Sequence, residues 1–226
     1  MFDQDRFARL RSAAVFCAEY HRGTIADTTH PARVMSFVGG TSWSQINGLP
    51  CISQAAVLDG TSSAAEPRIV DVTGAFSVEW CGRLDLAIAA STTLLAQVGP
   101  ASGGFSLSWD SVNTVYVLAL YDNAGAVARS ITTPATSAVV GPVTHLVMTS
   151  SAGGTVGTAM LHGVPVAAAL GGAGVAANIN ADGAIIAGGG ASGNATSVLA
   201  RAYPSALGRE DQTALAAACK SLAGEV

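Results

Sequence analysis

The feature that most constrains the fold is a series of short segments in which apolar and polar residues alternate. Residues 76–84, 105–109 and 112–121 are the clearest of these segments, and glycine, aspartate and asparagine separate them. Alternation of this kind is typical of strands with one buried face. Residues 122–125 read Asp-Asn-Ala-Gly, which predicts a hairpin turn. About a dozen such strands with few helices predict an antiparallel sandwich.

Short helices are expected at both ends of the chain. Apolar residues at Phe7, Leu10, Ala14 and Cys17 have the spacing of a helix face, but residues 13–20 fit a strand equally well, so periodicity leaves both alternatives open for this segment. Near the other end, two acidic residues follow Gly208 and suit the first turn of a helix.

Residues 142–215 contain an ordered set of motifs that resembles a known sandwich family. The motifs are a strand pattern from Thr144 to Thr149, a turn at His162 and Gly163, a glycine run at 188–190, a strand ending in Tyr203, and an acidic-headed helix. This order resembles the closing half of the laminin-G-like, or concanavalin A-like, jelly roll. The resemblance implies an all-β, antiparallel jelly roll over residues 13–226, preceded by an arm over residues 1–12.

Three shorter motifs support the same resemblance. Residues 58–60 read Leu-Asp-Gly, and residues 76–80 place phenylalanine, valine, glutamate and tryptophan in the family's order for a central strand. Tyr20, Gly23 and Asp27 match the end of its first strand, so the resemblance implies a short helix over residues 4–11 and an opening strand near 13–20. Because this fold serves lectins, glycosidases and structural domains alike, the resemblance does not determine a function.

Charge is distributed unevenly along the chain. The formal net charge is −4, and between residues 86 and 200 the only charged residues are Asp110, Asp122, Arg129 and Asp182. A monomer usually keeps a mixed, charged surface, so this census suggests that much of the surface meets other protein. A compositional bias toward alanine and arginine is the alternative explanation. An acidic chain without a basic stripe is a poor nucleic-acid partner.

Neither a membrane span nor a secretory signal is expected. No apolar run approaches the ~18 residues that a span needs, and the first residues lack a basic head followed by an apolar stretch. Cys17, Cys51, Cys81 and Cys219 are widely spaced without a zinc-ligand pattern, so four buried thiols are expected, with a disulfide pair as the alternative.

Catalytic and metal-binding patterns are weak. Glu79 and Asp85 are the nearest acids in a strand, but Gly82 separates them, and Glu79 is expected on a solvent face or at an interface. Asp110, Asn113, Asp122 and Asn123, and separately Asn178, Asn180 and Asp182, offer oxygen ligands for calcium, although turn chemistry explains them equally well. His145 is expected to be structural. No enzyme, cofactor or metal site is predicted.

The leading hypothesis is a non-enzymatic structural protein of a large assembly, a bacteriophage decoration, cement or fibre-associated protein. It places the chain in the virion, assembled in the host cytoplasm, with other capsid or tail proteins as partners. A homo-oligomer is expected, with a trimer favoured. Arg6, Arg9 and Arg11 are the candidate docking residues, because arginine forks pair specifically with carboxylates.

The alternative hypothesis is a carbohydrate-binding, lectin-like module that recognises a cell-surface glycan of the host. Such sites stack aromatic rings on sugars and surround them with polar groups. The aromatics that the core can spare are Trp43, Trp109, Tyr116 and Tyr121.

Overall fold

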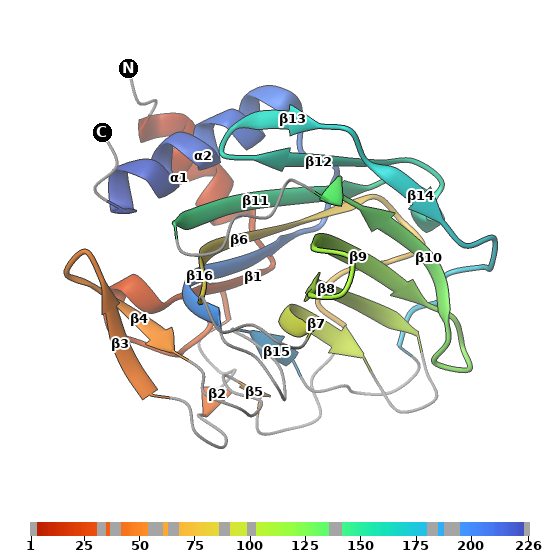
Figure 1. Cartoon of the computed structure of the whole chain (residues 1–226), viewed down its shortest axis with the longest axis horizontal. Helices are drawn as coiled ribbons and strands as arrows, with labels where there is room; N and C mark the ends of the chain where they lie inside the picture. The colour runs from red at the N-terminus through yellow and green to blue at the C-terminus, as the bar shows by residue number, and fades with distance from the viewer. Residues whose placement is uncertain are drawn as a thin grey trace.

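Two antiparallel sheets lie face to face, and two helices cover the outer face of one of them (Figure 1). The computed structural model describes residues 4–30, 35–36, 42–53, 61–62, 68–85, 91–98, 103–135, 142–179, 185–187 and 195–223. The predicted all-β sandwich with short terminal helices is confirmed. The motifs at 58–60 and 188–190 lie outside the described residues.

Sheet A carries the helices on its outer face. Its strand order is β13-β12-β11-β6-β16-β4-β3, and β1 also pairs with β16. The strands are β1 (Phe16–Glu19), β3 (Ser42–Ile46), β4 (Leu49–Ser53), β6 (Phe76–Leu84), β11 (Val143–Ser150), β12 (Gly157–Leu161), β13 (Val164–Val166) and β16 (Ala195–Tyr203).

Sheet B forms the other side of the sandwich, with the order β14-β10-β9-β8-β7-β15-β5-β2. Its strands are β2 (Met35–Ser36), β5 (Thr61–Ser62), β7 (Thr92–Val98), β8 (Gly104–Asp110), β9 (Val115–Tyr121), β10 (Val127–Thr132), β14 (Ala169–Gly171) and β15 (Ile185–Ala187).

The helices are α1 (Gln4–Ala13) and α2 (Arg209–Ala223), and short 3-10 turns η1 (Tyr20–Arg22) and η3 (Ala152–Gly154) accompany the strands. Both helices lie side by side over sheet A (Figure 1), where Leu10 and Leu215 share a buried cluster with Val147 and Tyr203 of the sheet. The predicted helix at 4–11 and strand near 13–20 are therefore present, with the strand limited to β1. His162 takes a φ of 52° in the turn between β12 and β13, as its place before Gly163 predicts.

The main core lies between the sheets and is filled by the alternate residues of the central strands. Phe76, Val78 and Trp80 of β6 are fully buried there, as their shared parity predicts. The indole of Trp80 donates from Nε1 to Ser197 Oγ at 2.8 Å. Gly82 leaves room for the same ring, since a Cβ at that position would lie 2.5 Å from Trp80 Cζ2.

The expectation of four free thiols is wrong for two of the cysteines. Cys81 of β6 and Cys219 of α2 form a disulfide that fastens the C-terminal helix to the centre of sheet A. They are 138 residues apart in the sequence, so only the packing of α2 on sheet A brings them together. Cys17 and Cys51 are free and buried, as expected.

Replacing Trp80 by alanine should lower the free energy of unfolding by about 3–5 kcal/mol, the usual range for a fully buried large aromatic residue. Urea denaturation followed by circular dichroism measures the loss. Trp43→Ala is the matched control, because Trp43 is 44% exposed and its removal should cost about 1 kcal/mol or less. Equal losses in the two variants would contradict the assignment of the inner face.

Candidate functional site

A buried group of charged side chains occupies the outer face of sheet A, beneath the helices. Arg201 of β16 lies at its centre and is fully buried. Its guanidinium contacts Glu79 Oε2 at 3.2 Å and Glu19 Oε1 of β1. Tyr203 donates to Glu79 at 2.7 Å, and His145 Nε2 lies 3.0 Å from the other carboxylate oxygen. Both carboxylate oxygens of Glu79 are therefore bonded to side chains of the neighbouring strands β11 and β16.

Helix α1 closes this charged group from above. Arg11 pairs with Glu19 at 2.7 Å, and the ring of Phe7 lies 5.3 Å from the guanidinium carbon of Arg201. Such a cation–π contact favours a desolvated arginine. The expectation that Glu79 faces solvent or an interface is wrong. Its parity puts it on the outer face, but the helices cover that face.

Both acidic side chains of this group are strongly stabilised as carboxylates. Burial by itself raises the pKa of Glu79, but the charge of Arg201 and the hydrogen bonds of His145 and Tyr203 outweigh it and lower the pKa to about 2. For Glu19, hydrogen bonds from Arg11 and the charge of Arg201 likewise outweigh burial and lower the pKa to about 2. Glu79 is fully buried and both of its carboxylate oxygens are bonded to protein groups, so it is not placed to serve as the acid or the nucleophile of a glycosidase.

The predicted docking arginines, Arg6, Arg9 and Arg11, all lie on helix α1, which covers the buried charged group. Arg6 pairs with the two carboxylates at the start of α2, at 2.9 and 2.8 Å, and Arg11 pairs with Glu19. Arg9 is exposed. The segment packs against the sandwich, and a docking role for its arginines stays a prediction.

The outer face of sheet B has the opposite chemistry. Here β7, β8, β9 and β15 form a hollow of about 330 Å³ that is lined by hydroxyl and uncharged apolar side chains. Ser106 and Ser108 of β8 face Ala96 and Thr93 of β7 across the ladder. The hollow is lined by Ser91, Thr92, Thr93, Ala96, Val98, Ser106, Ser108, Tyr121 and Ile186, and we call it the sheet B groove.

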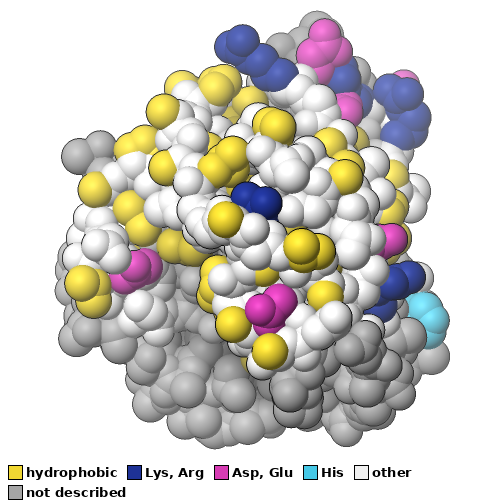
Figure 2. Space-filling model, turned by 90° about the vertical axis from the view of Figure 1, so that its right-hand side faces the viewer, with side chains coloured by type: hydrophobic (Ala, Val, Ile, Leu, Met, Phe, Trp, Pro, Cys, Tyr) yellow, Lys and Arg dark blue, Asp and Glu magenta, His cyan; other side chains and the backbone are white. Residues whose placement is uncertain are grey.

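Tyr121 supplies the aromatic ring of the sheet B groove. It is half-buried, and its hydroxyl lies 2.9 Å from Ser106 Oγ. None of the described residues that line the groove is charged. The neighbouring side of the molecule, over β10 and β14, is also mostly uncharged, whereas charged side chains gather at the helical end (Figure 2). The groove therefore offers hydrogen-bonding hydroxyls and one ring to a ligand.

The four aromatic residues predicted to contact a glycan lie in three different places. Tyr121 lines the sheet B groove, and Trp43 is exposed on β3 at the edge of sheet A. The prediction is wrong for Trp109 and Tyr116, which are buried and pack against each other at 5.3 Å between ring centroids. Trp109 and Tyr116 lie an even number of residues from the core leucines of their strands, so their side chains point to the same buried face. Tyr121 lies an odd number of residues from the core leucines of β9, and this difference in the sequence separates it from Tyr116.

Asp110, Asn113 and Asp122 serve turns, whereas Asn178 accepts from the backbone of Val72 and donates to the carboxylate of Asp71. Asp110 accepts from the backbone of Val112 and from the side chain of Asn113, and Asp122 accepts from the backbone of Ala124. Asn180 and Asp182 lie outside the described residues. Within the described parts of the chain, no group of three acidic, histidine or cysteine side chains has the arrangement of a metal site. The two acids considered as a glycosidase pair have separate partners: Asp85 forms an ion pair with Arg83, and Glu79 forms one with Arg201.

No described helix has the length and apolar character needed to cross a membrane.

Acidification should destabilise the protein between about pH 5 and pH 2. Because the pKa of Glu79 is lower in the folded state than its ordinary value, its contribution is complete above pH 5 and disappears as the pH falls toward 2. The loss is on the order of 3 kcal/mol for this carboxylate. Thermal melts at a series of pH values measure it. Glu79→Gln should be less stable than the unmodified protein at pH 7, and its stability should fall less as the pH is lowered from 5 to 2. An equal fall in both proteins over this pH range would refute the role of this side chain.

Comparison with known proteins identifies the fold. No family model matches the sequence, and no curated protein matches it. Several solved structures, however, resemble the structure of this chain. The binding domain of Paraclostridial mosquitocidal protein 1 has a TM-score of 0.68 at 14% identity, over 92% of this chain and 52% of that one. The botulinum neurotoxin serotype D binding domain has a TM-score of 0.70 at 10% identity, over 94% and 52%.

A further structure holds the serotype D ligand binding domain in complex with N-acetylneuraminic acid, with a TM-score of 0.69, 11% identity and coverage of 94% and 52%. The chain thus spans about half the length of these binding domains. The TM-scores show that the chain shares the sandwich fold of these domains, and identities this low show no closer relation. The similarity agrees with the predicted antiparallel sandwich.

Proposed function

We propose that this chain is a non-enzymatic, carbohydrate-binding module whose ligand site is the sheet B groove. The observation that carries the proposal is the juxtaposition of one half-buried ring, Tyr121, with a row of hydroxyls on a hollowed sheet face. An aromatic face packs on the apolar face of a sugar ring, and the serine and threonine hydroxyls exchange hydrogen bonds with sugar hydroxyls. A concave surface with a few convergent polar groups is typical of ligand sites.

Three further observations support this proposal. Helices α1 and α2 pack on the outer face of sheet A, whereas no described helix covers the outer face of sheet B, where the groove lies. The similar structures are described as binding domains, and one holds N-acetylneuraminic acid. The Cys81–Cys219 disulfide suits an oxidising environment, in which cell-surface glycans are also found.

A structural role in a bacteriophage virion is the second candidate. Its supporting observation is the weakly charged stretch from residue 86 to residue 200, which other virion proteins or further copies of the chain would cover. The bacteriophage origin, the trimer and the location in the virion belong to this proposal. The solved structures that resemble the chain favour the carbohydrate-binding module.

A glycan array carrying neutral and sialylated oligosaccharides, probed with and without calcium, tests the carbohydrate-binding proposal. We expect saturable binding that does not require calcium. For the strongest ligand, Tyr121→Ala should weaken binding at least about tenfold, equivalent to ~1.4 kcal/mol. Tyr121→Phe keeps the ring and should retain most of the affinity. Isothermal titration calorimetry measures both effects.

Trp43→Ala is the matched control, because it removes an exposed aromatic residue on the opposite sheet. It should leave the affinity unchanged. Loss of binding in Trp43→Ala with full binding in Tyr121→Ala would move the site to β3. Absence of binding to every glycan would contradict the proposed function.

A further inference from the structure

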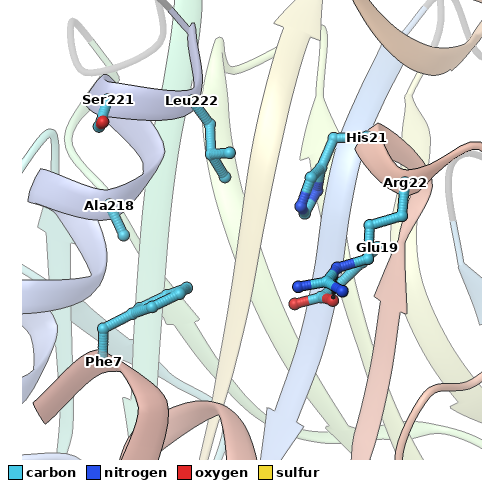
Figure 3. Close-up of a pocket in the computed structure, with 7 residues that line it drawn as sticks. All are labelled: Phe7, Glu19, His21, Arg22, Ala218, Ser221 and Leu222. Carbon is cyan, nitrogen blue, oxygen red and sulfur yellow. Dashed lines mark ion pairs between the residues drawn. The ribbon is translucent and has the colours of Figure 1, made fainter. Parts of the chain in front are cut away.

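A second cavity lies on the helical side of the molecule, separated from the sheet B groove by both sheets. It opens between the start of α1, the end of α2 and turn η1 (Figure 3). The lining residues are Phe7, Glu19, His21, Arg22, Ala218, Ser221 and Leu222, and we call this space the helix cavity.

One wall of the helix cavity is apolar. Phe7 projects from α1, and Ala218 and Leu222 project from α2, so that the three side chains face the same space (Figure 3). The cavity volume is about 160 Å³. Cavities of about 150 Å³ with apolar walls accommodate a benzene ring. The helix cavity therefore has room for one compact apolar group of that size.

The opposite wall is polar and holds the ion pair of Arg22 with Glu19. Arg22 donates from Nε to Glu19 at 2.7 Å and is half exposed. Among the described residues we find no partner for its two terminal amino groups. His21 projects into the same space (Figure 3), and its Nδ1 is buried without a protein partner among the described residues. Burial lowers the pKa of His21, so the ring is neutral at neutral pH.

The charges beside the cavity do not balance. Three arginines, Arg11, Arg22 and Arg201, surround two carboxylates, Glu19 and Glu79, which leaves one positive charge in excess. Of the three, Arg22 is the one with the most exposed side chain. An anionic group at the mouth of the cavity would meet Arg22, and guanidinium groups bind carboxylates through paired hydrogen bonds.

We propose that the helix cavity binds a small monocarboxylate with a compact apolar body of about the size of benzoate. The apolar body packs against Phe7 and Leu222, and the carboxylate pairs with Arg22. The buried Nδ1 of His21 lies beside the ligand and accepts a hydrogen bond from a donor on it or from an accompanying water. This site does not depend on the proposed carbohydrate site.

Titration of the full chain with sodium benzoate, followed by two-dimensional amide NMR, tests the site. Benzyl alcohol is the matched neutral probe. We expect benzoate to shift the amide signals of η1 and of the end of α2, and to raise the pKa of His21 because an anion favours the charged ring. Benzyl alcohol should bind at least about tenfold more weakly.

Two variants and one control locate the binding. Arg22→Gln should weaken benzoate binding at least about tenfold, and Arg9→Gln, an exposed arginine of α1 outside the cavity, should not. Leu222→Trp should fill the cavity and abolish binding while Arg22 remains in place. Thermal melts establish that each variant is folded. Absence of benzoate-induced shifts at the cavity, equal binding of benzyl alcohol, or unchanged binding by Arg22→Gln or Leu222→Trp would overturn the proposal.

Discussion

The arrangement of this protein depends on one fully buried arginine, Arg201, in the middle of sheet A. A charge at that depth is tolerated only when opposite charges and hydrogen bonds surround it. Glu79 and Glu19 supply the charges from the strands on either side, and Phe7 supplies an aromatic face from above. Without α1 and α2, this charged group would face water and sheet A would lack its outer layer. Arg11 and Phe7 complete this charged group, which explains why α1 folds onto sheet A, and the Cys81–Cys219 disulfide holds α2 on the same sheet.

Sheet B forms the other broad face of the sandwich, and that face carries the groove. Sheet B has no covering helix among the described residues, and its groove is lined by serines, threonines, one tyrosine and the apolar residues Ala96, Val98 and Ile186. None of these groove side chains is charged, and the hydroxyls supply hydrogen-bond donors and acceptors beside the apolar side chains. That chemistry matches a sugar, which has hydroxyls at its rim and apolar carbon faces.

Alternation along the strands predicted the sandwich and the inward position of Trp80, because both depend on local parity. Parity also contained the signal that separates Tyr121 from Tyr116, since Tyr116 shares the even positions of the core leucines in β9. It did not predict that Glu79 is buried, because a strand pattern identifies a face and not what covers it. The Cys81–Cys219 bridge and the helix cavity join segments some 140 to 210 residues apart in the sequence, and no local spacing encodes such contacts.

Hydrogen–deuterium exchange, with and without the oligosaccharide that binds most strongly, tests most directly whether the open face of sheet B is the recognition surface. Ligand should slow exchange in β7, β8 and β9, whose residues line the groove, and leave α1 and α2 unchanged. Protection confined to the helices or to β3, with β7 to β9 unaffected, would contradict the account.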